Sequence, residues 1–183
     1  MHSVVQHTFI DPTVAPHEGF AWRWYLPEDL KFRATNNLLE HLAAIVSPWV
    51  DILAGRLKSE DCVLSMTDST TAEGWLRKSN FSELGKNSIQ ASVRIEAARM
   101  QATLFMSLGI KSYSQWFRGD LNNVSDSLSR DDDRTDDELI NMYRASCPSQ
   151  IPSHFEIVPL PNEITSWLTA LLRKLPVNPQ YSE

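Results

Sequence analysis

The sequence predicts an α/β fold, in which strands alternate with helices. Three observations support this prediction: alternating aromatic residues at 20–26, a short apolar run at 62–67, and a long stretch with helical spacing at 88–108. Strands and helices that follow one another in this order are typical of a sheet covered by helices. The composition, 42% hydrophobic and 22% charged, is that of an ordinary globular chain.

The first part of the chain predicts one strand and one long helix. Residues 1–19 contain two prolines without sustained periodicity, so we expect a loop there. The strand at 20–26 (FAWRWYL) ends before a proline. A helix then begins at a cap provided by Asn36 or Asn37. Its apolar residues recur at helical spacing: Leu38, Leu42, Ile45, Trp49 and Leu53.

Pro48 lies inside this helical pattern and predicts either a kink or a second helix that begins at a Ser47 cap. The segment at 62–67 (CVLSMT) is short and apolar, so we expect a buried strand with Cys62 in the core. The remaining predicted elements are helices at 70–78 and 88–108, a strand at 113–117, a turn at 119–122 and a helix at 123–130.

The chain changes character after Arg130. An acidic run at 131–138 (DDDRTDDE) leads into a predicted helix at 136–144, and a Pro- and Ser-rich link at 148–161 precedes an amphipathic helix at 162–174. We therefore expect three parts: an N-terminal loop at 1–19, an α/β domain at 20–130, and an acidic linker with a helical C-terminal tail at 131–183.

Charge and cysteine content exclude several protein classes. The formal net charge of −6 argues against a broadly basic protein that coats nucleic acid. Two cysteines are too few for a disulfide framework or a zinc site. The first residues show no basic region followed by an apolar run, and no apolar run is long enough to span a bilayer. We expect an intracellular protein, cytoplasmic or nuclear, without a membrane partner.

Three acidic residues lie where they could carry chemistry. Glu40 falls on the first helix with small residues nearby on the same face, Asp68 follows the second strand, and Asp126 lies in the short helix at 123–130. Each also has a simpler interpretation. Glu40 fits a solvated helix face, Asp68 fits a helix N-cap, and Asp126 fits a surface acid near a helix start.

Three motifs containing these acids occur in a family order. The stretch at 123–130 (NVSDSLSR) resembles the N-V-A-D-x-L-S-R motif that closes the ribonuclease H domain of retroelement (retrotransposon) reverse transcriptase polyproteins. The stretch at 67–72 (TDSTTA) resembles the T-D-N-x-x-A strand end of these domains, and 38–43 (LLEHLA) resembles the helix with their glutamate. The resemblance covers roughly 20–130.

The resemblance implies a ribonuclease H-like mixed sheet flanked by helices, with the first strands missing. It further implies a nuclease that cleaves the RNA strand of RNA–DNA hybrids, with Glu40, Asp68 and Asp126 as catalytic residues and ligands of Mg²⁺, or of Mn²⁺. The family's first strand is central, carries a fourth carboxylate, and is followed by a hairpin. Asp11 is the one aspartate available for that role, and Pro12 spoils the match, so we expect weak cleavage at best.

Two other functions stay open. One is a non-catalytic ribonuclease H-like relic or interaction domain, and the other is an integrase- or transposase-type nuclease that acts on DNA. Other domains of the same polyprotein are further candidate partners, with the helix at 162–174 either docking them or simply packing. Basic residues expected on the surface are candidates for phosphate contacts: Arg77, Lys78, Lys86, Arg94 and Arg99. Five tryptophans are expected in the core rather than as platforms for base stacking: Trp22, Trp24, Trp49, Trp75 and Trp116.

Overall fold

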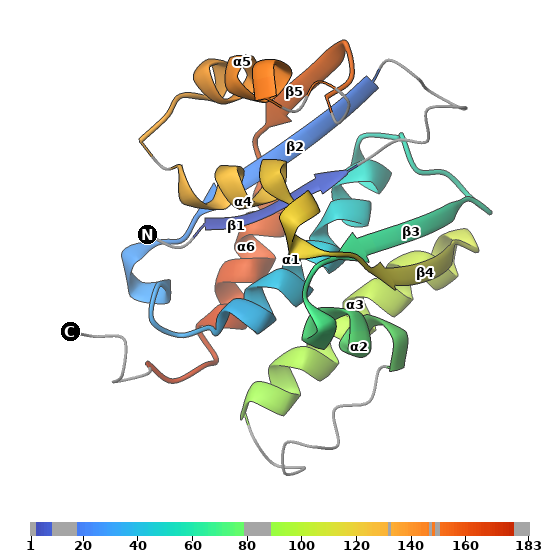
Figure 1. Cartoon of the computed structure of the whole chain (residues 1–183). Helices are drawn as coiled ribbons and strands as arrows, with labels where there is room; N and C mark the ends of the chain where they lie inside the picture. Colours follow the sequence, from blue (N-terminus) through green and yellow to red (C-terminus); the bar gives the residue numbers. More distant parts are fainter. Residues whose placement is uncertain are drawn as a thin grey trace.

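A computed structural model describes residues 3–8, 18–78, 89–131, 133–146, 148 and 151–177. Strands and helices are interleaved along the chain, which confirms an α/β class built on small sheets (Figure 1). The strands are β1 (Ser3–Thr8), β2 (Glu18–Tyr25), β3 (Cys62–Thr67), β4 (Lys111–Trp116) and β5 (His154–Val158). The helices are α1 (Asn36–Leu53), α2 (Thr70–Lys78), α3 (Ile89–Leu108), α4 (Asn123–Arg130), α5 (Asp136–Ser146) and α6 (Asn162–Leu172), with short 3-10 turns η1 (Glu28–Leu30) and η2 (Gly119–Leu121).

The strands form two small sheets. In the first, β2 is central, antiparallel to β1 on one side and parallel to β5 on the other. The second sheet is the parallel pair of β3 and β4, in which Leu64 lies opposite Tyr113. Within the described residues, β1 and β3 each have a strand on one side only.

The prediction of a loop at 1–19 is wrong in two places, because Ser3–Thr8 forms β1 and β2 begins at Glu18. The link expected at 148–161 likewise contains β5. Both short strands are defined by their hydrogen bonds to β2, and a strand fixed by its partner needs no long alternating pattern of its own. Asp11 lies outside the described residues.

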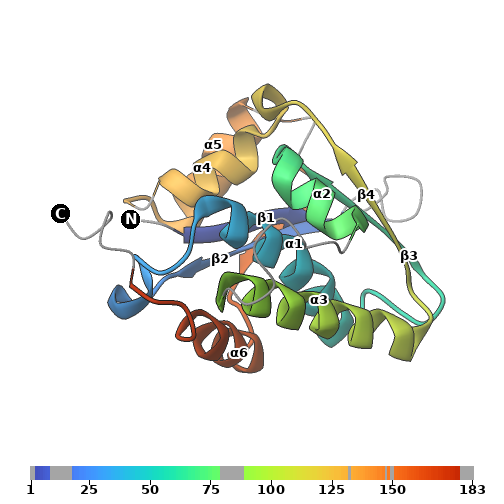
Figure 2. The ribbon, with the colours of Figure 1, turned by 90° about the horizontal axis from the view of Figure 1, so that it is seen from below.

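The larger core contains residues from both the early and the late parts of the chain. It lies between α1, β2, α3 and α6, and Figure 2 shows α6 next to the first part of α3. Its fully buried members include Trp22, Leu42, Ile45, Leu168, Leu171 and Leu172. The indole Nε1 of Trp22 donates a hydrogen bond of 3.1 Å to Ser47 Oγ inside this core. The segment expected to be a tail therefore belongs to the same folded body, and α6 is a packing helix.

A second, smaller core lies beneath α4 and α5. Val124 and Leu128 of α4 are buried there with Leu139 and Tyr143 of α5 and with Phe155 of β5. Figure 1 shows α4 and α5 on the same side of the first sheet. This core fixes α4, and with it the position of the acid that α4 carries.

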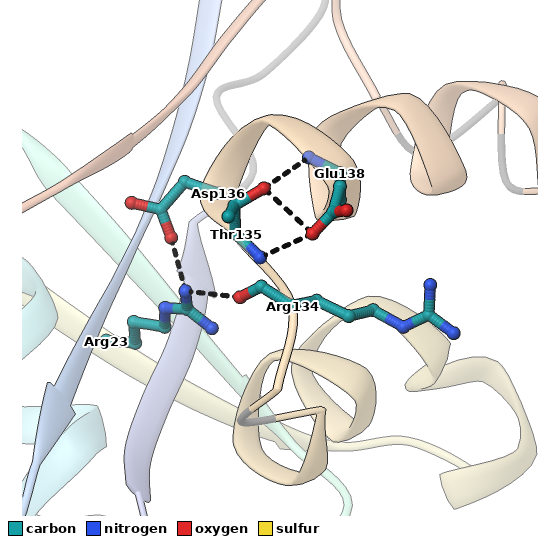
Figure 3. A network of polar contacts seen from close by, with 5 residues as sticks. All are labelled: Arg23, Arg134, Thr135, Asp136 and Glu138. Atoms are coloured by element: carbon teal, nitrogen blue, oxygen red, sulfur yellow. Dashed lines mark hydrogen bonds and ion pairs between the residues drawn. The ribbon is translucent and has the colours of Figure 1, made fainter.

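Polar contacts anchor α5 to β2 (Figure 3). The guanidinium of Arg23 donates 3.0 Å to the carbonyl oxygen of Arg134 and lies 2.7 Å from Asp136 Oδ1. The Thr135 backbone N–H donates 2.8 Å to Glu138 Oε2, and Glu138 N–H donates 3.3 Å to Thr135 Oγ1, which makes a capping box. Hydrogen bonds from the Thr135 backbone and then its side chain lower the pKa of Glu138. Part of the acidic run is thus a helix start.

The first long helix differs from expectation at both of its uncertain points. Its N-cap is Thr35, whose Oγ1 accepts a hydrogen bond of 3.4 Å from Leu38 N–H, in place of Asn36 or Asn37. The helix continues through Pro48 to Leu53, so no second helix begins there. Because the helix is buried on nearly every side between Leu38 and Val50, its packing compensates for the backbone hydrogen bond that proline cannot make.

The expected burial of β3 is wrong. Ser65 is its one buried residue, whereas Leu64 is 56% exposed, Met66 is 43% exposed, and Cys62 is exposed and not in the core. Successive side chains of a strand point to opposite faces, and the exposed Leu64 and Met66 lie on the face opposite the buried Ser65. The apolar run therefore supplies one covered face and one open face.

In the part of the chain that the structure describes, no helix combines the length and apolar character that crossing a membrane requires.

Candidate functional site

The three predicted acids lie in one neighbourhood at the carboxyl end of β3. Asp68 follows β3 directly, Glu40 lies in the first turns of α1, and Asp126 lies in the first turn of α4. Burial raises the pKa of Glu40, and the negative charges of Asp68 and Asp126 raise it further. Interactions between charges weaken with distance in salt solution, so the effect of Asp68 and Asp126 on the pKa of Glu40 means that the three carboxylates are near one another. The fold therefore brings together three residues that are far apart in sequence.

Ser69 connects Glu40 to the start of α2. Its Oγ accepts a hydrogen bond of 3.1 Å from Ala72 N–H, and its carbonyl oxygen accepts one of 3.0 Å from Glu73 N–H. A hydrogen bond between the Ser69 side chain and Glu40 lowers the pKa of Glu40 and so partly opposes the burial. The N-cap of α2 is therefore Ser69 and not Asp68. The sequence could have indicated Ser69, because the side chain of an N-cap residue accepts a hydrogen bond from the backbone N–H three residues later.

The end of β4 forms the other side of the Asp68 environment. Trp116 Nε1 donates a hydrogen bond of 2.9 Å to the carbonyl oxygen of Asp68, and its ring is 46% exposed. The prediction that Trp116 is a core residue is therefore wrong. A side chain at Gly119 would have its Cβ 3.3 Å from Asp68 Oδ2, so the chain passes close to this carboxylate.

Asp126 is held on a well-anchored helix. Val124 and Leu128 bury the underside of α4. Asp126 Oδ2 lies 3.2 Å from the guanidinium of Arg130, one turn along the helix. Both side chains are substantially exposed, so this ion pair contributes little to stability and can be broken by a competing cation.

The site does not form a complete metal centre. Mg²⁺ prefers carboxylate oxygens, and the three acids are of that type. Within the described ranges, however, no three side chains of His, Cys, Asp or Glu come close enough to hold one ion. Glu40, Asp68 and Asp126 therefore share an electrostatic environment without converging on a point, and as they lie they do not fit a resident Mg²⁺ or Mn²⁺.

The candidate phosphate contacts have different surroundings. Arg94 is 7% exposed and stacks 3.9 Å from the centre of the Trp75 ring, so its role is structural. Arg77 is exposed and pairs with Glu73, and Arg99 is exposed. The side chains of Lys78 and Lys86 lie outside the described residues. None of these cations is placed next to the three acids by a described contact.

Replacing Glu40 by glutamine should stabilise the protein at neutral pH. The folded pKa of Glu40 is raised above 4.5, so the native state binds its proton more tightly than the unfolded state does. Stability therefore falls as pH rises from the unfolded value through the folded one, and Glu40→Gln removes this loss. In EDTA, the melting temperature of Glu40→Gln should exceed that of the wild type at about pH 7 and match it at about pH 4.

Glu156→Gln, on the exposed side of β5, is the matched control for loss of a carboxylate and should leave the melting temperature unchanged. A Glu40→Gln variant that melts below the wild type at neutral pH would show that the ionised carboxylate of Glu40 does not destabilise the folded state.

Comparisons with protein-family models, with curated proteins and with solved structures found no match for this chain.

Proposed function

We propose that this chain is a ribonuclease H-like domain of a retroelement reverse transcriptase polyprotein, which acts on the RNA strand of RNA–DNA hybrids. The observation that carries the proposal is the raised pKa of Glu40, to which the charges of Asp68 and Asp126 contribute. A titratable group whose pKa is shifted by burial and by neighbouring charges is typical of functional sites. The same three residues carry the motifs that resemble this family.

The arrangement of strands supports the proposal as well. The family's central first strand is followed by a hairpin, and here β1 and β2 form an antiparallel pair while β3 and β4 are parallel. The edges of β1 and β3 are open in the described part of the chain, both strands pack on α1, and Figure 1 shows them running in opposite directions. A strand between them, antiparallel to β1 and parallel to β3, would join the two sheets.

In this proposal the central strand supplies the fourth carboxylate. Three acids that do not converge should bind Mg²⁺ or Mn²⁺ weakly, because each carboxylate missing from the coordination shell removes an oxygen ligand and a negative charge. We therefore expect weak hybrid cleavage by the isolated chain. Positioning of the scissile phosphate is most of what such a site contributes, so weak metal binding and weak cleavage go together.

The direct test is a hybrid duplex with a labelled RNA strand, incubated with Mg²⁺ or Mn²⁺. We expect slow cleavage of the RNA strand that stops in EDTA and that falls by about 100-fold or more in Asp68→Asn. Asp29→Asn is a matched control, since Asp29 pairs with Arg173 on the surface. Cleavage that persists in Asp68→Asn would remove Asp68 from the site, and preferential cutting of duplex DNA would favour a DNA nuclease instead.

A non-catalytic relic is the second candidate, and one observation favours it: no three metal-ligating side chains converge in the described part of the chain. Metal titration separates the two functions. A ligand that binds only the folded state stabilises it by about 1.4 kcal/mol at ten times its dissociation constant. The proposed nuclease should therefore melt at a higher temperature in excess Mn²⁺, whereas the relic should show no change and no cleavage.

A further inference from the structure

Trp116 is an exposed aromatic residue that is nevertheless fixed in place. It ends β4 and lies opposite Thr67, the last residue of β3, so it is next to Asp68 at the same end of the sheet. Its indole N–H bonds to the Asp68 carbonyl oxygen at 2.9 Å, while 46% of the residue remains exposed. The hydrogen bond restricts rotation of the ring, so its open surface is held beside a proposed catalytic residue.

An exposed cation lies close to Trp116 in the chain. Arg118 follows it by two residues, and its side chain is 73% exposed. The guanidinium of Arg118 pairs with the surface carboxylate of Asp120, and an exposed pair of this kind exchanges easily for phosphate. An aromatic ring together with an arginine is a combination with which proteins hold nucleotides independently of sequence.

We propose that Trp116 is a nucleic-acid contact, which stacks on a base or sugar of the strand next to Asp68 and so positions the phosphate to be cut. This inference rests on the proposed function and names how the substrate is held there. Every base has a flat face, so the contact is independent of sequence. Trp116 acts as a binding and positioning residue, and the carboxylates keep the chemistry.

Tyr113 provides a matched control on the same strand. It is 60% exposed, more than Trp116, but the two residues are three positions apart, so they point to opposite faces of β4. Loss of either ring removes exposed aromatic surface from β4. Only loss of the ring at 116 removes it from beside Asp68.

The experiment measures equilibrium binding of a fluorescent RNA–DNA hybrid to the full chain in EDTA, where no cleavage occurs. We expect Trp116→Ala and Trp116→Leu to bind about tenfold more weakly than the wild type, and Trp116→Phe to bind within about threefold of it. Tyr113→Ala should bind as the wild type does. The dependence of affinity on salt should keep its slope in Trp116→Ala, because stacking neutralises no phosphate.

Unchanged affinity in both Trp116→Ala and Trp116→Leu would overturn the inference and leave the proposed function intact. Equal losses in Trp116→Ala and Tyr113→Ala would overturn it too, since they would indicate a general effect on β4. Failure of the wild type to bind any hybrid would overturn the proposed function and the inference together. Melting curves of each variant identify a loss of affinity that comes from unfolding. If Trp116→Ala and Trp116→Leu unfold, the affinity of Trp116→Phe, which keeps an aromatic ring, tests the inference.

Discussion

A chain that ends after Pro148 should not unfold cooperatively, because it lacks β5 and α6. Full burial of an aliphatic side chain contributes about 2 kcal/mol, so the five almost completely buried ones that are lost from the larger core contribute roughly 10 kcal/mol, comparable to the stability of a whole domain. These five are Ile164, Leu168, Leu171, Leu172 and Leu175. Circular dichroism during urea titration should show a broad, non-cooperative change in place of a single transition.

Point variants of α6 test whether its buried side chains are the cause of this loss of stability. Leu168→Ala removes a side chain that is 1% exposed and should lower the free energy of unfolding by about 3 kcal/mol. Glu163→Ala, on the exposed side of the same helix, should change it by less than about 0.5 kcal/mol. A shortened chain with a sharp transition at the wild-type midpoint would mean that residues 20–130 fold without their C-terminal partner.

Acid should destabilise the protein through His41. This residue is 1% exposed, its ring meets Trp75 edge-on at 5.4 Å, and burial, with the charge of Arg94 as a second cause, lowers its pKa from 6.5 to about 4. Between those values the unfolded state binds more protons than the native state. Stability is therefore complete above about pH 6.5 and falls as pH decreases towards 4, by about 3 kcal/mol in all.

His41→Phe should flatten this dependence while keeping an aromatic ring against Trp75. The measurement is the free energy of unfolding by urea at several values between about pH 7 and pH 4.5, compared between the variant and the wild type at each pH. The comparison is needed because Glu40, with its raised pKa, has the opposite dependence in the lower part of this range. Parallel curves for the two proteins would exclude His41 as the group responsible.

Local sequence signals predicted the elements that depend on local structure. The helices α2 and α4 and the strand β3 lie at the residues predicted for them, and Gly109 ends α3 with φ of +67°, a conformation that favours glycine. The strands β1 and β5 could not be predicted in this way. Each owes its existence to hydrogen bonds with β2, and pairing with another strand leaves no periodic signal in the short strand itself.

The candidate site, too, could be predicted from the sequence only in part. Motifs identified Glu40, Asp68 and Asp126, and the folded chain places them in one neighbourhood. Motifs did not reveal the hydrogen bond that fixes Trp116 to the Asp68 carbonyl oxygen, because it forms only when two parallel strands align. The failure of the acids to converge is equally invisible in a motif, since ligand geometry depends on differences of an ångström or two.

The pairing of β2 with β5 joins Ala21 to Ile157, near opposite ends of the chain. A growing polypeptide therefore cannot complete this sheet until the ribosome has synthesised β5, and until then one edge of β2 has no partner. Exposed edges of this kind attract other nascent chains. Production in cells should consequently depend on chaperones during translation, and slowing elongation should lower the yield of folded protein.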